Sequence, residues 1–234
     1  MNQSKSLALG RSGKRHPARA SQAETRSFRD YYFQAIVRPR QTFDALVVDH
    51  RRVTMGLLAV SISAILYTVV YIGLTVAGGA PTVFEPWLAI PKEAYFRYDI
   101  FILAPSMFAG WILAAGVVQL LSRLAGGQGS FEDTLSVLGF GIGLATWATG
   151  IHELTDSVLG ALGIINVNQY EALLNGQTFW HYLYLCLSLL YLGGMVWLFS
   201  KGISAAQRIR PLPAFIFGVL AFLIYQFFFF IFNR

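Results

Sequence analysis

The stretch LPAFIFGVLAFLIYQFFFFIF, residues 212–232, decides the fold class of this chain. It contains no charged residue, and as a helix it is long enough to cross the hydrocarbon core of a bilayer, which takes about 20 residues. The composition of the whole chain agrees, because 55% of its 234 residues are hydrophobic and only 13% are charged. Soluble domains are about 25% charged. The chain is therefore predicted to be a polytopic membrane protein.

Four other apolar segments have nearly the same length. They predict, with the first, five membrane-spanning helices at about residues 54–76, 100–121, 134–151, 180–198 and 212–232. The third is the shortest, and its pattern is compatible with an interfacial helix that continues through Val158. We therefore expect an all-α fold in which residues 54–234 form a bundle of five transmembrane helices. The single cysteine, Cys186, excludes an intramolecular disulfide.

Two regions precede the first span. Residues 1–26 are rich in Ser, Gly, Ala and Arg, and they are predicted to form a disordered basic tail because they carry too little apolar surface to fold. An organellar transit peptide has a similar composition and is the alternative, so whether this tail is retained or cleaved stays open. Residues 27–53 place aromatic side chains, among them Phe28 and Tyr32, at helical spacing and predict amphipathic helices. These helices are expected either on the membrane surface or against the protein's own cytosolic loops.

The distribution of basic residues predicts the orientation. Of the 18 Lys and Arg residues, 15 fall on the side of the N-terminus and 3 on the other side. The positive-inside rule then places the N-terminus in the cytoplasm and the C-terminus outside, as an odd number of spans also requires. The same basic N-terminal segment favours anionic lipid headgroups as a partner. Nucleic acid is not expected, because no folded reader accompanies the charge.

Small residues predict where the helices approach one another, since lipid tails are as apolar as the helix faces themselves. Such residues in the second, third and fourth spans are expected to form packing faces among these three helices. They are Gly110, Ala114, Gly139, Gly143, Gly193 and Gly194.

One polar cluster is a candidate metal site. His152 and Asp156 stand four residues apart, so a helix places them on one face, in a pattern related to the zinc-binding His-Glu-x-x-His helix. His181, on the same side of the membrane, is the third candidate ligand. The simpler interpretation is the polar end of a span whose acids face water. Apart from His181, no ionisable residue is expected near mid-membrane, which disfavours ion-coupled transport.

The glycine-rich connection at residues 126–130 predicts a tight turn. It follows an apolar helix and not a strand, and it matches neither of the glycine-rich phosphate-binding fingerprints. Ser130 is placed to cap the next helix, with Glu132 and Asp133 in the first turn.

Two segments resemble the Yip family of Ypt-interacting proteins (YIPF). Pro39 and Phe43 are similar to the Pro…Phe…hydrophobic stretch that precedes the first span in that family. Residues 126–139, GGQGSFEDTLSVLG, are similar to its loop between the second and third spans. The residues that carry this second motif are Gly126, Gly127, Gly129, Ser130 and Phe131.

The resemblance implies five spans and a cytosolic N-terminus, and it assigns no catalytic residue. Eukaryotic members bind prenylated Rab GTPases and act in vesicle traffic between endoplasmic reticulum and Golgi. Their N-termini are longer and less basic than this one, so whether GTPase binding applies to this chain stays open. The compact form is more similar to bacterial members, which implies the inner (plasma) membrane as its location, with an organellar membrane as the alternative.

The leading hypothesis is a non-enzymatic membrane protein without a cofactor, which organises the local bilayer or a partner through its basic face. That partner is an unidentified membrane or cytosolic protein, and a homo-oligomer is left open. A small-solute transporter or channel is the first alternative. An outward-facing metal-dependent hydrolase at His152, Asp156 and His181 is the second.

Overall fold

The computed structural model describes residues 26–81 and 90–232, and over these residues the chain is helical without a strand. The predicted basic tail, residues 1–26, lies outside the described residues except for Arg26. The helices in chain order are α1 (Phe28–Val37), α2 (Pro39–Leu46), α3 (Arg52–Val76), the short 3-10 helix η1 (Lys92–Ala94), α4 (Tyr95–Leu124), α5 (Phe131–Ala145), α6 (Trp147–Ala161), α7 (Val167–Asn175), α8 (Phe179–Gln207) and α9 (Pro211–Phe232). The predicted all-α polytopic bundle is confirmed.

Four of these helices, α3, α4, α8 and α9, are each long and apolar enough to cross a membrane. The pair α5 and α6 passes the same test together as one span, bent by 46° at Thr146. The hydroxyl group of Thr146 donates a hydrogen bond back to the carbonyl of Ile142, 2.8 Å away, next to this bend. Helix continues beyond the predicted span 134–151, to Ala161, close to the continuation through Val158 with which the sequence pattern is compatible.

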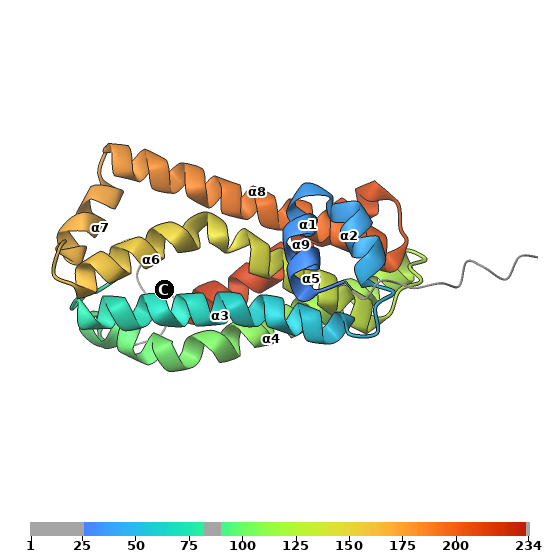
Figure 1. Cartoon of the computed structure of the whole chain (residues 1–234), viewed down its shortest axis with the longest axis horizontal. Helices are drawn as coiled ribbons and strands as arrows, with labels where there is room; N and C mark the ends of the chain where they lie inside the picture. Colours follow the sequence, from blue (N-terminus) through green and yellow to red (C-terminus); the bar gives the residue numbers. More distant parts are fainter. Residues whose placement is uncertain (1–25, 82–89, 233–234) are drawn as a thin grey trace, which may run out of the picture.

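The long helices run side by side along the long axis of the molecule, and α1 and α2 lie across them near one end (Figure 1). We call this end, which also holds the α4–α5 and α8–α9 connections, the N-terminal end of the bundle. Helix α5 packs between α3 and α8, while α9 packs against α4 and α8. The centre is filled by fully buried apolar side chains such as Leu103, Ile142 and Met195. These contacts leave one stripe of each long helix facing outward.

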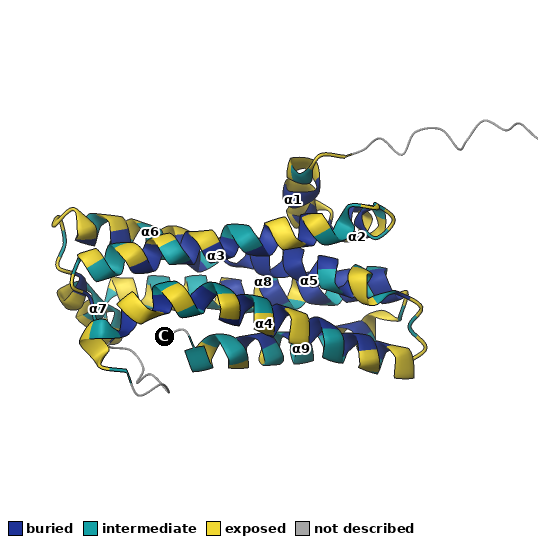
Figure 2. Ribbon diagram, turned by 90° about the horizontal axis from the view of Figure 1, so that it is seen from below, coloured by how far each residue is buried: buried dark blue, intermediate teal, exposed yellow. Residues whose placement is uncertain are grey.

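The outward stripes are apolar. Figure 2 shows exposed residues along the outer faces of the long helices, and they include Ile65, Phe101 and Leu212, each more than 60% exposed. A soluble bundle would carry charge there, whereas a lipid-facing surface is as apolar as the interior.

The glycines pack differently from the expected scheme among the second, third and fourth spans. A Cβ atom at Gly139 would lie 2.6 Å from the carbonyl oxygen of Gly56 in α3, so the third span meets the first. Gly110 faces α9, where its Cβ would lie 3.0 Å from that of Phe228.

The glycine pair of the fourth span does not form a close helix contact. A Cβ atom at Gly193 or Gly194 would meet no atom within 4 Å, so the expectation of a packing face at these two positions is wrong. Apolar sequence alone does not distinguish a helix-facing glycine from a lipid-facing one, because both environments are apolar.

Candidate functional site at the N-terminal end of the bundle

Helix α1 begins at a capping box. The Ser27 hydroxyl accepts the N–H of Asp30, while the Ser27 N–H donates to the Asp30 carboxylate at 3.0 Å. The Ser27 hydroxyl also donates to the Asp30 carboxylate at 2.7 Å, and this bond, with the one from the Ser27 N–H, lowers the pKa of Asp30 because both favour its charged form. Pro39 stands at the first position of α2, where its missing N–H has no intrahelical partner to lose. Local sequence therefore sets where both helices start.

One face of α1 and α2 is buried against the spans. Its side chains pack on residues of α5 and α8 such as Phe140 and Leu198, and they include Tyr31, Tyr32, Ala35, Phe43 and Leu46. The sequence allowed these helices to lie on the membrane surface or against the protein's own loops. This face packs against the protein, but its contacts are with the spans and not with loops.

Tyr32 anchors α1 at the bend between α5 and α6. Its hydroxyl group donates to the carbonyl of Gly143 at 2.5 Å and accepts the indole N–H of Trp147 at 2.8 Å. Burial raises the pKa of Tyr32 to about 12, although the hydrogen bond from Trp147 acts the other way. The neutral phenol is therefore the form that the folded protein holds.

The opposite face of α1 is open and carries large apolar side chains, with the exposed polar residues Asp30 and Gln34 among them. Phe33 is 61% exposed, Ile36 54% and Val37 77%. Basic side chains are exposed beside them, namely Arg29, Arg38 and Arg40. This combination of apolar and basic residues on an uncovered helix is typical of an interfacial helix.

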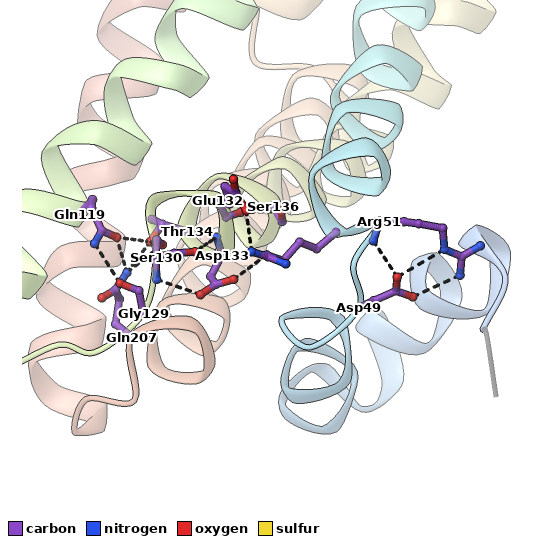
Figure 3. A network of polar contacts seen from close by, with 11 residues as sticks. Asp49, Arg51, Gln119, Gly129, Ser130, Glu132, Asp133, Thr134, Ser136 and Gln207 are labelled. Atoms are coloured by element: carbon purple, nitrogen blue, oxygen red, sulfur yellow. Dashed lines mark hydrogen bonds and ion pairs between the residues drawn. The ribbon is translucent and has the colours of Figure 1, made fainter. Parts of the chain in front are cut away.

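A compact turn joins α2 to α3. The backbone N–H of Arg51 donates to the carboxylate of Asp49 at 2.8 Å, and the guanidinium group of Arg51 lies 3.2 Å from the same carboxylate (Figure 3). Tyr31 adds a hydrogen bond to Asp49 at 3.3 Å. Burial alone would raise the pKa of Asp49, but the hydrogen bonds and charge of Arg51 outweigh it and lower that pKa. The turn thus fixes α1 and α2 relative to the start of α3.

The glycine-rich connection packs onto the last turn of α8. Gly126 has a φ of 81°, a conformation that favours glycine. A Cβ atom at Gly129 would overlap the carbonyl group of Ala206. The N–H of Gln128 donates to the carbonyl of Gln207 at 3.0 Å. The glycines therefore allow the chain to turn tightly here and let its backbone approach α8 closely.

Three buried polar side chains join α4, α5 and α8 beneath this turn (Figure 3). The amide of Gln207 donates to Gln119 and to Thr134, each at 2.5 Å, and Thr134 donates to Gln119 at 3.0 Å. Gln119 in turn donates to the carbonyl of Gly129 at 3.0 Å. This network is not predicted from the sequence, because its members are up to 88 positions apart and no local pattern links them.

The start of α5 is held by a second set of contacts. Ser130 and Asp133 form the expected capping box, in which the N–H of Ser130 donates to the Asp133 carboxylate at 2.8 Å. Arg52 of α3 pairs with Asp133 at 2.7 Å and with Glu132 at 2.5 Å. These polar groups are engaged with one another, so they hold the N-terminal end together.

The candidate metal ligands lie at the opposite end, and the structure does not gather them. His152 contacts Asp156 at 3.0 Å through Nδ1 and Tyr170 at 2.8 Å through Nε2. His181 instead contacts the carbonyl of Leu174 at 2.6 Å. No group of three His, Cys, Asp or Glu side chains within residues 26–81 and 90–232 is placed to hold a metal ion.

The acids of α6 are also less open to water than the sequence interpretation assumed. The side chain of Asp156 is 18% exposed. Glu153 is half-buried, and the hydroxyl of Tyr184 in α8 lies 3.5 Å from its carboxylate. Both acids are therefore only partly open to water, because residues of α7 and α8 contact this part of α6.

A bundle of apolar helices with a lipid-compatible exterior defines an all-α integral membrane protein. The model of the Yip1 domain family matches residues 33–232, which include α2 to α9, and the chain belongs to this family. The resemblance drawn from the two motifs is thereby confirmed. Comparison with curated proteins and with solved structures found no significant match.

Proposed function

We propose that the protein is a non-enzymatic scaffold in the bacterial inner membrane, with its N-terminal end in the cytoplasm. There its basic N-terminal segment, residues 1–52, binds anionic headgroups and presents the end of the bundle to a protein partner. The observation that carries this proposal is the uncovered face of α1, where Phe33 and Val37 stand beside exposed arginines. The excess of Lys and Arg on this side supports the orientation.

The energetics favour a bilayer surface as the neighbour of this face. The exposed side chains of Phe33, Ile36 and Val37 gain free energy on leaving water, at about 25 cal/mol per Å² of apolar surface. Each basic residue close to an anionic surface adds roughly 1 kcal/mol. The packing of Tyr32 on the spans holds α1 beside the bundle, so this binding does not require the helix to fold at the membrane.

The first experiment places α1 relative to the bilayer. Spin labels are attached to cysteines at Val37 or Gln34 in the full chain, in a Cys186→Ser background and in vesicles of phosphatidylglycerol and phosphatidylcholine. We expect the label at Val37 to be accessible to oxygen and protected from a water-soluble relaxant, and the label at Gln34 to be open to water. Equal water accessibility at both positions would overturn the membrane placement of this face.

The second experiment tests the role of charge. A dye attached to a cysteine at Ser12 of the full chain reports energy transfer to labelled headgroups. Transfer should be stronger in vesicles with phosphatidylglycerol than in pure phosphatidylcholine, and it should fall as salt screens the charges. The same transfer in both vesicles would show that charge is not the recognition element.

A solute transporter is the second candidate, favoured by one observation. Glu153 lies within the bent span α5–α6, half-buried against Tyr184, and acids within membrane-spanning segments commonly mark substrate or proton paths. Flux of small solutes into proteoliposomes that is lost in Glu153→Gln would favour this candidate. Absence of flux with the native chain would exclude the transporter for the solutes tested and favour the scaffold function.

A further inference from the structure

A groove of about 570 Å³ runs along the outer surface where α8 meets α9 and α2. Helix α8 contributes most of its lining, α9 contributes Phe215, and α2 contributes Arg40. The groove lies outside the polar network of the N-terminal end and uses none of the residues that carry the proposed function, apart from Arg40.

The chemistry of the groove changes along its length. Gly193 and Val196 make one part apolar, Trp197 follows, and Lys201 and Arg40 line the part toward Ser204. None of the described residues that line it is acidic, and neither base forms an ion pair with a described acid. The two positive charges are therefore available to an anion at one end of an apolar channel.

The length of the groove matches one leaflet of a bilayer. From Leu192, at the apolar end, to Lys201 is nine residues of α8, or about 14 Å at a rise of 1.5 Å per residue. Half of the hydrocarbon core is about 15 Å. Trp197 stands between the apolar and the basic parts, and tryptophan is enriched where hydrocarbon meets headgroups.

Two glycines on α8 allow this groove to be tested by a matched pair of substitutions. A Cβ atom at either Gly193 or Gly194 would meet no neighbour within 4 Å, so a larger side chain fits at both positions. Gly193 lines the groove and Gly194 does not. The hydroxyl groups of Ser200 and Ser204 already donate to backbone carbonyls at 2.6 and 3.0 Å, which leaves the two bases as the main recognition groups.

We propose that this groove binds one anionic phospholipid from the leaflet at the N-terminal end of the bundle. The headgroup phosphate lies between Arg40 and Lys201, and an acyl chain follows Trp197, Val196 and Gly193 against Phe215. A phospholipid in this place joins α2 to the α8–α9 pair. Binding here does not depend on residues 1–25, so it is separate from binding by the basic tail.

The test uses the full chain, purified in mild detergent, stripped of lipid and titrated with phosphatidylglycerol or phosphatidylcholine under native mass spectrometry. We expect one tightly bound phosphatidylglycerol per chain, with at least a tenfold preference over phosphatidylcholine. Gly193→Leu should weaken this binding about tenfold by filling the groove, whereas Gly194→Leu should leave it unchanged. Equal binding by these two variants would overturn the proposal, and so would equal affinity for the two lipids.

A second variant keeps the test decisive if Gly193→Leu lowers the yield of folded protein. Lys201 is exposed, so Lys201→Gln should fold normally and lose most of the preference for phosphatidylglycerol. An unchanged preference in this variant refutes the headgroup site. Removal of residues 1–25 should leave the bound lipid in place, and Lys201→Gln should leave the energy transfer from the dye at Ser12 unchanged, so a failure of the groove and a failure of the proposed function are distinguishable.

Discussion

Gly143→Ala should destabilise the bundle although alanine is the better helix former. A Cβ atom at this position would lie 2.5 Å from the carbonyl oxygen of Ala59 in α3, and ordinary contact begins at 3.4 Å. The helices α3 and α5 must therefore separate locally by about 0.9 Å. The neighbouring atoms belong to the backbone of α3 and to the Cβ of Ala59, so no flexible side chain can move aside.

The expected magnitude follows from two opposing effects. Overpacking of a close contact costs about 1–3 kcal/mol. Replacing glycine by alanine within a helix stabilises the helix by up to about 1 kcal/mol, because alanine has the higher helix propensity. We expect a net loss of about 1–2 kcal/mol, because lipid offers no hydrophobic compensation for the contacts that are lost. For a chain of this size, that loss corresponds to a fall in melting temperature of roughly 2–8 °C.

The assay is thermal unfolding of the purified full chain in one detergent, followed by intrinsic tryptophan fluorescence. Gly194→Ala is the matched control, since a Cβ atom there meets nothing within 4 Å and only the propensity change remains. It should melt at or slightly above the temperature of the native chain. If Gly143→Ala melts together with Gly194→Ala, then α3 and α5 do not meet at this glycine and the described packing is wrong.

Three further predictions concern the N-terminal end and the orientation. Gln207→Met should cost about 1–3 kcal/mol of stability, measured by thermal unfolding, because it removes the donor of a buried network, while the exposed Gln128→Met should change little. Equal effects of these two changes would contradict the network. The raised pKa of Tyr32, about 12 against an ordinary 10, means that its contribution to stability is complete below pH 10 and is lost as the pH rises toward 12. Tyr32→Phe should therefore lose stability less steeply than the native chain across that window, and parallel pH curves would refute the burial of the phenol. A reporter fused after Arg234 should be found outside and one inserted at Gly127 in the cytoplasm, whereas a cytoplasmic C-terminus would mean an even number of spans.

The sequence alone was sufficient where the physics is local. The class of protein follows from runs such as 212–232, because an apolar helix of that length has few stable surroundings other than lipid. The cap at Ser130 and Asp133 could be predicted because both partners lie within one turn. The glycine-rich turn before it also carries a local signal, and the Yip motif that contains it pointed to the family.

Only the tertiary structure decided which faces meet. Tyr32 bonds to Gly143, 111 positions away, and Gln207 bonds to Gln119, 88 positions away. The sequence near these residues contains no pattern that predicts either pair. The glycines show the physical reason most clearly. A Cβ atom at Gly143 would clash with α3 whereas one at Gly194 would meet nothing within 4 Å, yet both glycines stand in apolar helices. In a membrane, a neighbouring helix and a lipid tail have the same polarity, so hydropathy identifies a span but only packing distinguishes its inner face from its outer one.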